Sequence, residues 1–200
     1  CCRHAEPELT PKGVEQAQAL GRRLRGQRFD AAYSSDLSRA HRTALYALEH
    51  HAEPIEPVLD PGLREMHYGE WESLKGGEIG ARDPDLLREF FRCKVPAPGG
   101  ESVEQVRART AAALRRTVEA HPESTLLVVS HGNAIMAMIA ELLNVPNESS
   151  WSFAVTNTSI TRLIFSKRGR MTLAGFNDHS HLDGDAALAL VTLQVGLFSV

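Results

Sequence analysis

The chain has 200 residues and a mass of 22.0 kDa, the size of one domain with room for a small insertion. Hydrophobic residues make up 42% and charged residues 24%, values that fit a soluble globular protein and exclude a disordered one. The net charge of -3 argues against a general nucleic-acid-binding protein, which is usually basic. Three cysteines exclude a disulfide framework and favour a reducing compartment, so we expect a cytoplasmic protein.

The first part of the chain alternates helix and strand patterns. The elements expected up to residue 62 are a helix over 11–24, a strand over 29–34, a helix over 37–48 and a strand over 55–59. Thr10 precedes Pro11, which is typical of an N-cap followed by proline at the first helical position. Asp36 is expected to cap the second helix. Asp60-Pro61-Gly62 predicts a turn after the second strand.

The same alternation continues after a segment that is richer in glycine, proline and charge. We interpret residues 70–98 as a loop and lid over a site, with one short helix over 86–91. Ser102 is expected to cap the next helix. The remaining elements are a helix over 103–118, a buried strand over 126–129, a helix over 132–143 and a hairpin of strands over 160–165 and 171–176.

This order of elements predicts the fold class. Strands that alternate with helices indicate an α/β fold, a three-layer α/β/α sandwich with a mostly parallel central sheet. Ligands of such sheets bind at the carboxyl ends of the strands. Candidate site residues are therefore sought where a strand ends.

The two ends of the chain are unusual. The chain begins with Cys1-Cys2, and we interpret this start as trimmed or incomplete. It shows no signal-peptide pattern. Residues 186–200 form an apolar run, interrupted by Gln194, that is shorter than the roughly 20 residues of a membrane-spanning helix. We expect this run to dock on the core as a last strand or helix and expect no stable membrane association; a partner-binding tail is the alternative.

His131 is the first candidate site residue, because it lies where a buried strand ends and a helix begins. The free N–H groups of a helix start favour an anion. A histidine at this position can donate to a phosphate oxygen, and Gly132 allows close approach of the backbone. Alternatively, His131 merely caps the turn.

Arg39 and Glu65 are two further candidates. Arg39 falls in the first turn of a helix, where the dipole disfavours a cation, so an anionic ligand is one explanation for it. Glu65 precedes a glycine and two aromatic residues, and a carboxyl shielded by aromatic surface can have a raised pKa and act as a general acid. For both residues the alternative is an ordinary surface side chain. Arg3-His4, near the start of the chain, is a weak signal by itself.

Taken together and in order, these blocks resemble the histidine phosphatase superfamily, the phosphoglycerate-mutase-like proteins. The resemblance covers roughly residues 3–182 and includes Asn157 and the N-D-H-S-H-L run at 177–182. It rests on R-H at 3–4, S-S-D-L-S-R-A-H-R-T-A at 34–44, L-R-E-M-H-Y-G-E-W-E at 63–72, G-G-E-S at 99–102 and V-V-S-H-G at 128–132.

The resemblance implies a phosphatase that needs no metal and no other cofactor. His4 is implied as the nucleophile, because a neutral imidazole can attack phosphorus and form a phosphohistidine. Glu65 is implied to protonate the leaving oxygen and then help to deprotonate the attacking water. The residues implied to hold the phosphoryl oxygens are Arg3, Arg39, His131 and Gly132.

The substrate class and two alternatives follow from the same resemblance. About thirty residues separate Gly69 from Gly99. The resemblance implies that mutases of the family are longer, with an extended insertion in this interval, so we expect the compact phosphatase branch. Its substrates are small phosphomonoesters such as sugar phosphates, phosphoglycerates or alpha-ribazole phosphate. A phosphoglycerate mutase-type phosphotransferase is one alternative. The other is a non-catalytic phospho-ligand binding protein with a shortened N-terminal motif.

Specificity is expected to lie in the lid. The candidates to line an apolar subsite are Tyr68, Trp71, Phe90 and Phe91, although Phe90 and Phe91 are more typical of core packing. His179 and His181, with neighbouring aspartates Asp178, Asp183 and Asp185, have no spacing that fits a metal site, and we interpret this segment as a loop.

The match departs from the family at the N-terminus. The family has an apolar strand before R-H, whereas only Cys1 and Cys2 stand there in this chain, and the loop after Glu6 is short. We interpret both departures as missing segments. Residues 1–182 are expected to form the domain, with 183–200 as a tail docked on it. A homodimer is plausible on base rates alone.

Overall fold

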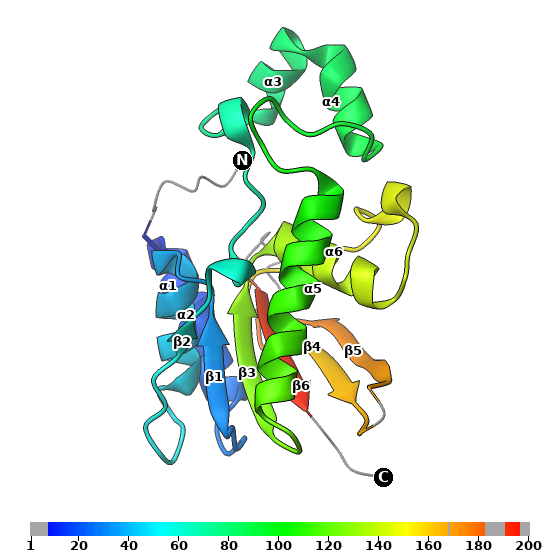
Figure 1. Ribbon diagram of the computed structural model, residues 1–200. Helices are drawn as coiled ribbons and strands as arrows, with labels where there is room; N and C mark the ends of the chain where they lie inside the picture. Colours follow the sequence, from blue (N-terminus) through cyan, green and yellow to red (C-terminus); the bar gives the residue numbers. More distant parts are fainter. Residues whose placement is uncertain (1–7, 168, 183–190, 197–200) are drawn as a thin grey trace.

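The computed structural model describes residues 8–167 and 169–182, and the backbone of residues 191–196. Its strands are β1 (Ala31–Ser34), β2 (Val58–Leu59), β3 (Thr125–Ser130), β4 (Ser159–Phe165), β5 (Met171–Asp178) and β6 (Val191–Gly196). They form one six-stranded sheet in the order β2-β1-β3-β6-β4-β5 (Figure 1).

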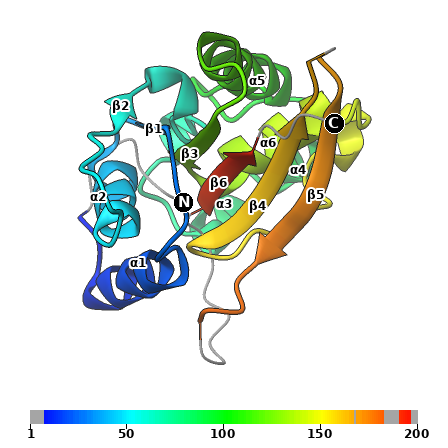
Figure 2. The same ribbon diagram turned by 90° about the horizontal axis from the view of Figure 1, so that it is seen from below.

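Helices cover both faces of this sheet. They are α1 (Pro11–Arg23), α2 (Ser38–Leu48), α3 (Gly76–Arg82), α4 (Pro84–Phe91), α5 (Val103–Ala120) and α6 (Gly132–Leu142), with short 3-10 turns η1 (Pro61–Leu63), η2 (Gly69–Trp71) and η3 (Asn147–Ser149). Seen along the sheet in Figure 2, α1 and α2 lie on one side and α5 and α6 on the other. The predicted three-layer α/β/α architecture is confirmed.

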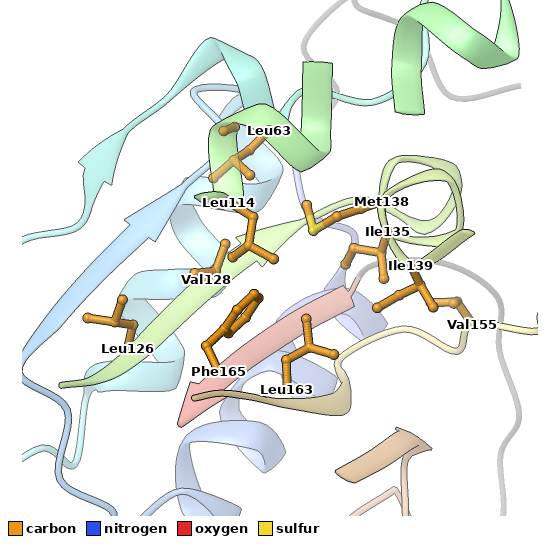
Figure 3. Packing of buried hydrophobic residues seen from close by; sticks show 11 residues of the cluster. Leu63, Leu114, Leu126, Val128, Ile135, Met138, Ile139, Val155, Leu163 and Phe165 are labelled. Carbon is orange, nitrogen blue, oxygen red and sulfur yellow. The ribbon is translucent and has the colours of Figure 1, made fainter. Parts of the chain in front are cut away.

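Strand β3 shows why the sheet is covered on both faces. Its residues Leu126 and Val128 pack into a cluster with side chains of α5 and α6 (Figure 3), and the intervening Leu127 and Val129 pack against α1 and α2. All four are fully buried. Alternate residues of a strand point to opposite faces, so an uninterrupted apolar run is the pattern that a strand between two helical layers requires.

The strand directions make the sheet mixed, with a parallel part that bears the site. β1 pairs in parallel with β2 and with β3. β6 lies between β3 and β4, antiparallel to β3 and parallel to β4, and β5 is antiparallel to β4. The C-terminal apolar run, expected as a last strand or helix, thus supplies a strand in the interior of the sheet. Whether the domain divides at residue 182 stays a prediction.

Two of the three expected helix caps are present. Thr10 Oγ1 accepts the N–H of Gly13 at 3.1 Å, and Ser102 forms a capping box with Gln105. The expected cap by Asp36 is wrong, because the N-cap residue of α2 is Leu37 and no side chain caps it. The Asp36 carboxylate instead accepts two hydrogen bonds from the Arg64 guanidinium, at 2.7 and 2.6 Å. The guanidinium offers the carboxylate two parallel charge-assisted hydrogen bonds.

The lid and the second strand differ from expectation. The strand expected over 55–59 is only Val58–Leu59. Residues 70–98 hold two helices instead of one, because α3 forms despite its three glycines and buries Ile79. Glycine lowers helix propensity, so this helix depends on its tertiary contacts. Within the part of the chain that the structure describes, no helix has the length and hydropathy to cross a membrane.

Candidate active site

The site lies at the edge of the sheet where β1 and β3 end. Ser35, the residue after β1, donates its N–H to the carbonyl of Val129 at 2.9 Å. Ser130, the last residue of β3, donates its hydroxyl to the carbonyl of Leu63 at 2.7 Å. These bonds bring three chain segments together: the turn into α2, the start of α6 and the loop that follows η1.

His131 is buried at this edge, with 2% of its surface exposed. Its Nε2 lies 2.9 Å from Ser35 Oγ, which also accepts the N–H of Leu37 at 3.3 Å. His131 is the N-cap residue of α6, but its side chain makes no capping hydrogen bond. The alternative that it merely caps the turn is therefore wrong, and its imidazole is oriented by the end of β1.

Glu65 lies under the start of α6 and is also 2% exposed. Its Oε1 accepts the N–H groups of Met66 and Ala134 at 2.8 and 3.0 Å, and its Oε2 accepts that of Asn133 at 3.4 Å. Burial raises the pKa of the Glu65 carboxyl, and these backbone hydrogen bonds and the charge of Arg39 lower it to a smaller extent. Glu65 is thus a buried group with a raised pKa, not the surface glutamate of the alternative.

The N–H groups at the start of α6 bind a side chain of the protein, whereas a phosphate was expected there. The sequence pattern assigned this helix start, with Gly132, to a phosphate. In the structure the Glu65 carboxyl accepts the N–H groups of Asn133 and Ala134. The helix start therefore anchors a carboxyl of the chain itself, and Gly132 is buried beside it.

Arg39 completes the described part of the site. It lies in the first turn of α2 and is only 6% exposed, so the surface-arginine alternative is wrong. Its charge acts on the Glu65 carboxyl. The structure thus brings together Arg39, Glu65, His131 and Gly132, from three separate parts of the sequence. Arg3 and His4 lie outside the described residues.

The lid stands over this edge of the sheet (Figure 1). Tyr68, which precedes the lid, is buried in one cluster with the lid residues Trp71 and Phe90. Trp71 therefore packs in a core instead of lining a subsite, and so does Phe90. Phe91 is 62% exposed, so the core-packing alternative is wrong for this residue. The Tyr68 hydroxyl accepts a hydrogen bond from Asn133 Nδ2, which ties the lid to α6 beside Glu65.

Gly69 fixes how closely the lid approaches the loop before α5. Its φ is +52°, and a Cβ on it would stand 2.0 Å from the carbonyl oxygen of Pro98. The N–H of Glu70 donates to the same oxygen at 2.8 Å. Only glycine fits this backbone-to-backbone contact without strain.

Several residues near the site were not singled out from the sequence. Ser35 stands within a quoted block and Asn133 directly follows one, so closeness to a strand end was the available signal. Arg109 has no such signal, because an arginine within a helix is usually solvated. Its contacts with the Glu65 loop are seen only in the structure.

The structure holds no candidate metal cluster of three or more histidine, cysteine, aspartate or glutamate residues in the ranges it describes. Burial lowers the pKa of His181, although Asp178 opposes this shift. Asp183 and Asp185 lie outside the described residues. Asn157, part of the resemblance, donates from Nδ2 to Gln16 Oε1 at 3.2 Å.

A cavity of about 660 Å³ lies at the opposite edge of the sheet from the site. It is lined by side chains from the ends of α5, α6 and β4, and none of the candidate site residues borders it. Its lining includes Arg115, Val118, Leu142, Phe165 and Lys167.

Comparisons with known proteins identify the family. Residues 1–179 match the family described as the histidine phosphatase superfamily (branch 1). The chain is 36% identical over 144 residues to the 2,3-bisphosphoglycerate-dependent phosphoglycerate mutase of Brucella canis, covering 68% of this chain and 70% of that protein. It is 31% identical over 170 residues to phosphoserine phosphatase 1 of Hydrogenobacter thermophilus, covering 84% and 80%.

A solved structure agrees with these sequence matches. Phosphoserine phosphatase from Entamoeba histolytica, in complex with 3-phosphoglyceric acid, superposes with a TM-score of 0.77 at 30% identity, over 90% of this chain and 88% of that chain. Fold and relatives together define an α/β enzyme that acts on phosphate esters. The chain belongs to the histidine phosphatase superfamily and is a phosphoric monoester hydrolase of that superfamily.

Proposed function

We propose that the protein hydrolyses small phosphomonoesters without a metal ion, through a phosphohistidine on His4. The observation that carries this proposal is the convergence of Arg39, Glu65 and His131, all nearly fully buried, at one edge of the sheet. A buried carboxyl with a raised pKa beside a cation and an imidazole suits proton transfer to an ester oxygen.

The proposed reaction has two steps. An imidazole nitrogen of His4 attacks phosphorus, the bond to the ester oxygen breaks, and protonated Glu65 gives its proton to the departing alcohol. Water then attacks the phosphorus of the phosphohistidine, and the Glu65 carboxylate accepts a proton from this water. The bond between phosphorus and the His4 nitrogen breaks, so inorganic phosphate leaves and the imidazole is regenerated. Arg3, Arg39 and His131 would neutralise the phosphoryl oxygens in both steps, which removes the need for a metal ion.

The substrate is proposed by class. Relatives of the chain include a phosphoserine phosphatase whose structure holds 3-phosphoglyceric acid, a small phosphorylated acid. We infer that this protein also takes a small phosphorylated metabolite and that lid residues 70–98 select it. A homodimer and a cytoplasmic location stay predictions.

The test is a phosphate-release assay over small phosphomonoesters in the presence of EDTA. The proposal expects turnover that survives EDTA and is lost in His4→Ala, and an acid-labile phosphoprotein that forms in the parent but not in the variant. Undiminished turnover by His4→Ala would exclude the phosphohistidine route. Loss of turnover in EDTA, restored by a divalent cation, would exclude metal independence.

A phosphoglycerate mutase-type activity is the second candidate, supported by the match to the Brucella canis mutase. The expected difference in length does not separate the two activities, because the aligned region covers similar shares of this chain and of that mutase, 68% and 70%. The assay of choice follows 3-phosphoglycerate and its products. Interconversion of phosphoglycerates without phosphate release would favour the mutase, and stoichiometric phosphate release would exclude it.

A further inference from the structure

Arg109, on α5, uses all five of its N–H donors on the loop that carries Glu65 and on one carboxylate beside it. Nη1 donates to the carbonyl oxygens of Gly62 and Arg64 at 3.1 and 2.9 Å. Nη2 donates to the carbonyl oxygen of Glu65 at 3.4 Å and to Glu101 Oε2 at 2.7 Å, and Nε donates to Glu101 Oε1 at 2.8 Å. A guanidinium has five N–H groups, so its hydrogen-bonding capacity is filled here.

Glu101 extends the same contact past Glu65. Its Oε2 also accepts the N–H of His67 at 2.9 Å, and its own N–H donates to the carbonyl oxygen of His67 at 2.8 Å. The Arg109 and Glu101 side chains are 24% and 23% exposed, so the pair is largely shielded from water. The loop is therefore held on both sides of Glu65, at residues 62–65 by Arg109 and at His67 by Glu101.

The carboxyl group of Glu65 is held from another direction. Its oxygens accept N–H groups from α6, whereas its backbone is held by α5. Two different helices thus determine where the carboxyl group stands relative to Arg39 and His131. Proton transfer depends steeply on such placement, and a displacement of about 1 Å can cost a factor on the order of 100 in rate.

We propose that Arg109, together with Glu101, is a positioning residue that places Glu65 for proton donation to the leaving group. This inference rests on the proposed function, because it requires Glu65 to be the general acid. Arg109 makes its contacts with carbonyl oxygens and Glu101, and it acts on the reaction through Glu65. Lysine cannot replace it, since an ammonium group lacks the planar fork that reaches both the carbonyls and the carboxylate.

Leaving-group dependence separates positioning from a purely structural role. A nitrophenolate leaves readily without a proton, whereas an alkoxide needs one, so loss of the general acid penalises alkyl phosphates more than p-nitrophenyl phosphate. The experiment measures kcat/KM for glycerol 2-phosphate and p-nitrophenyl phosphate in the parent, Glu65→Gln and Arg109→Lys. Because kcat/KM reports the steps up to leaving-group departure, hydrolysis of the phosphohistidine does not mask the effect.

The inference expects Arg109→Lys to lower kcat/KM for the alkyl ester by about 100-fold and for the aryl ester by less than about tenfold. Glu65→Gln should show the same selectivity, and Arg109→Lys should have little further effect in that background. The matched control is Arg116→Lys, on the same helix, whose pair with Asp60 lies at 3.2 Å and contacts the loop before Glu65. It should leave both values unchanged.

The outcomes are distinct. An equal loss with both esters in Arg109→Lys, while Glu65→Gln is selective, would overturn the positioning role and leave the proposed function intact. A Glu65→Gln variant without leaving-group selectivity would overturn the acid role of Glu65, and the inference with it. If Arg109→Lys does not fold, Glu101→Gln replaces it, because it weakens the same contact; selectivity for the aryl ester supports the inference, and an unchanged ratio overturns it.

Discussion

Two opposing effects act on the Glu65 carboxyl. Three backbone N–H groups and the charge of Arg39 stabilise its ionised form, while removal from water destabilises it. Removal from water is the larger effect, so the pKa is raised. Hydrogen bonds from neutral N–H groups do not fully replace the hydration of an ion, which explains the direction. A carboxyl in this state can hold a proton when substrate binds and release it during turnover.

The raised pKa of Glu65 predicts how stability depends on pH. Folded protein binds this proton more tightly than unfolded protein, so Glu65 costs stability as pH rises from its ordinary pKa of 4.5 through its folded pKa. Glu65→Gln removes this cost. Urea unfolding should show the variant gaining stability relative to the parent as the pH rises between these two pKa values. A difference between Glu65→Gln and the parent that does not change with pH would contradict the prediction.

The helices around the site differ in how their N-termini are capped. α1 starts at a Thr10 cap followed by Pro11, and α5 starts at the Ser102 capping box. α2 has no side-chain cap, and Asp36, which comes before its N-cap residue Leu37, pairs with Arg64 instead. The Arg64 pair links the turn into α2 to the loop that carries Glu65. One acidic residue thus joins two segments of the site where a cap would have served one helix only.

The cap of α1 can be tested directly. Thr10→Ala removes the oxygen that accepts the N–H of Gly13 and should lower the free energy of unfolding by about 1 kcal/mol. Thr10→Ser keeps the oxygen and should retain most of the stability. Chemical denaturation of both variants measures the difference. Equal losses in the two variants would assign the effect to the threonine methyl group and not to the cap.

The sheet is joined across its middle by β6. Its residues pair with β3 on one side and with β4 on the other, from Val191 to Gly196. The parallel part, β2-β1-β3, and the hairpin of β4 and β5 have β6 between them in the sheet order. The strand at this position therefore connects the site-bearing half of the molecule to the remaining half through backbone hydrogen bonds.

Proline within β6 should weaken the whole molecule. Gln194→Pro removes an N–H group from an interior strand, and an unmade buried backbone hydrogen bond costs about 1–3 kcal/mol. Total stabilities are about 5–15 kcal/mol, so the denaturation midpoint should fall measurably. Gln194→Thr, which keeps the N–H group, is the control. A midpoint unchanged by proline would contradict the placement of β6 between β3 and β4.

Structural features that depend only on neighbouring residues could be predicted from the amino-acid sequence. The caps at Thr10 and Ser102, the buried strand before His131 and the alternation of helix and strand are local patterns, and the structure agrees with them. The motif order also led to Arg39, Glu65 and His131, which the structure brings to one edge; their roles, with those of Arg3 and His4, stay proposals.

Contacts between residues far apart in the sequence could be found only in the three-dimensional structure. Asp36 binds Arg64, 28 residues away, instead of capping its own helix. Arg109 reaches the Glu65 loop across 44 residues, and β6 enters the sheet between two strands that precede it in the chain. In the sequence, an arginine within a helix looks the same whether its side chain is solvated or binds a loop. The physical reason is that the partner is supplied by packing, which no local pattern encodes.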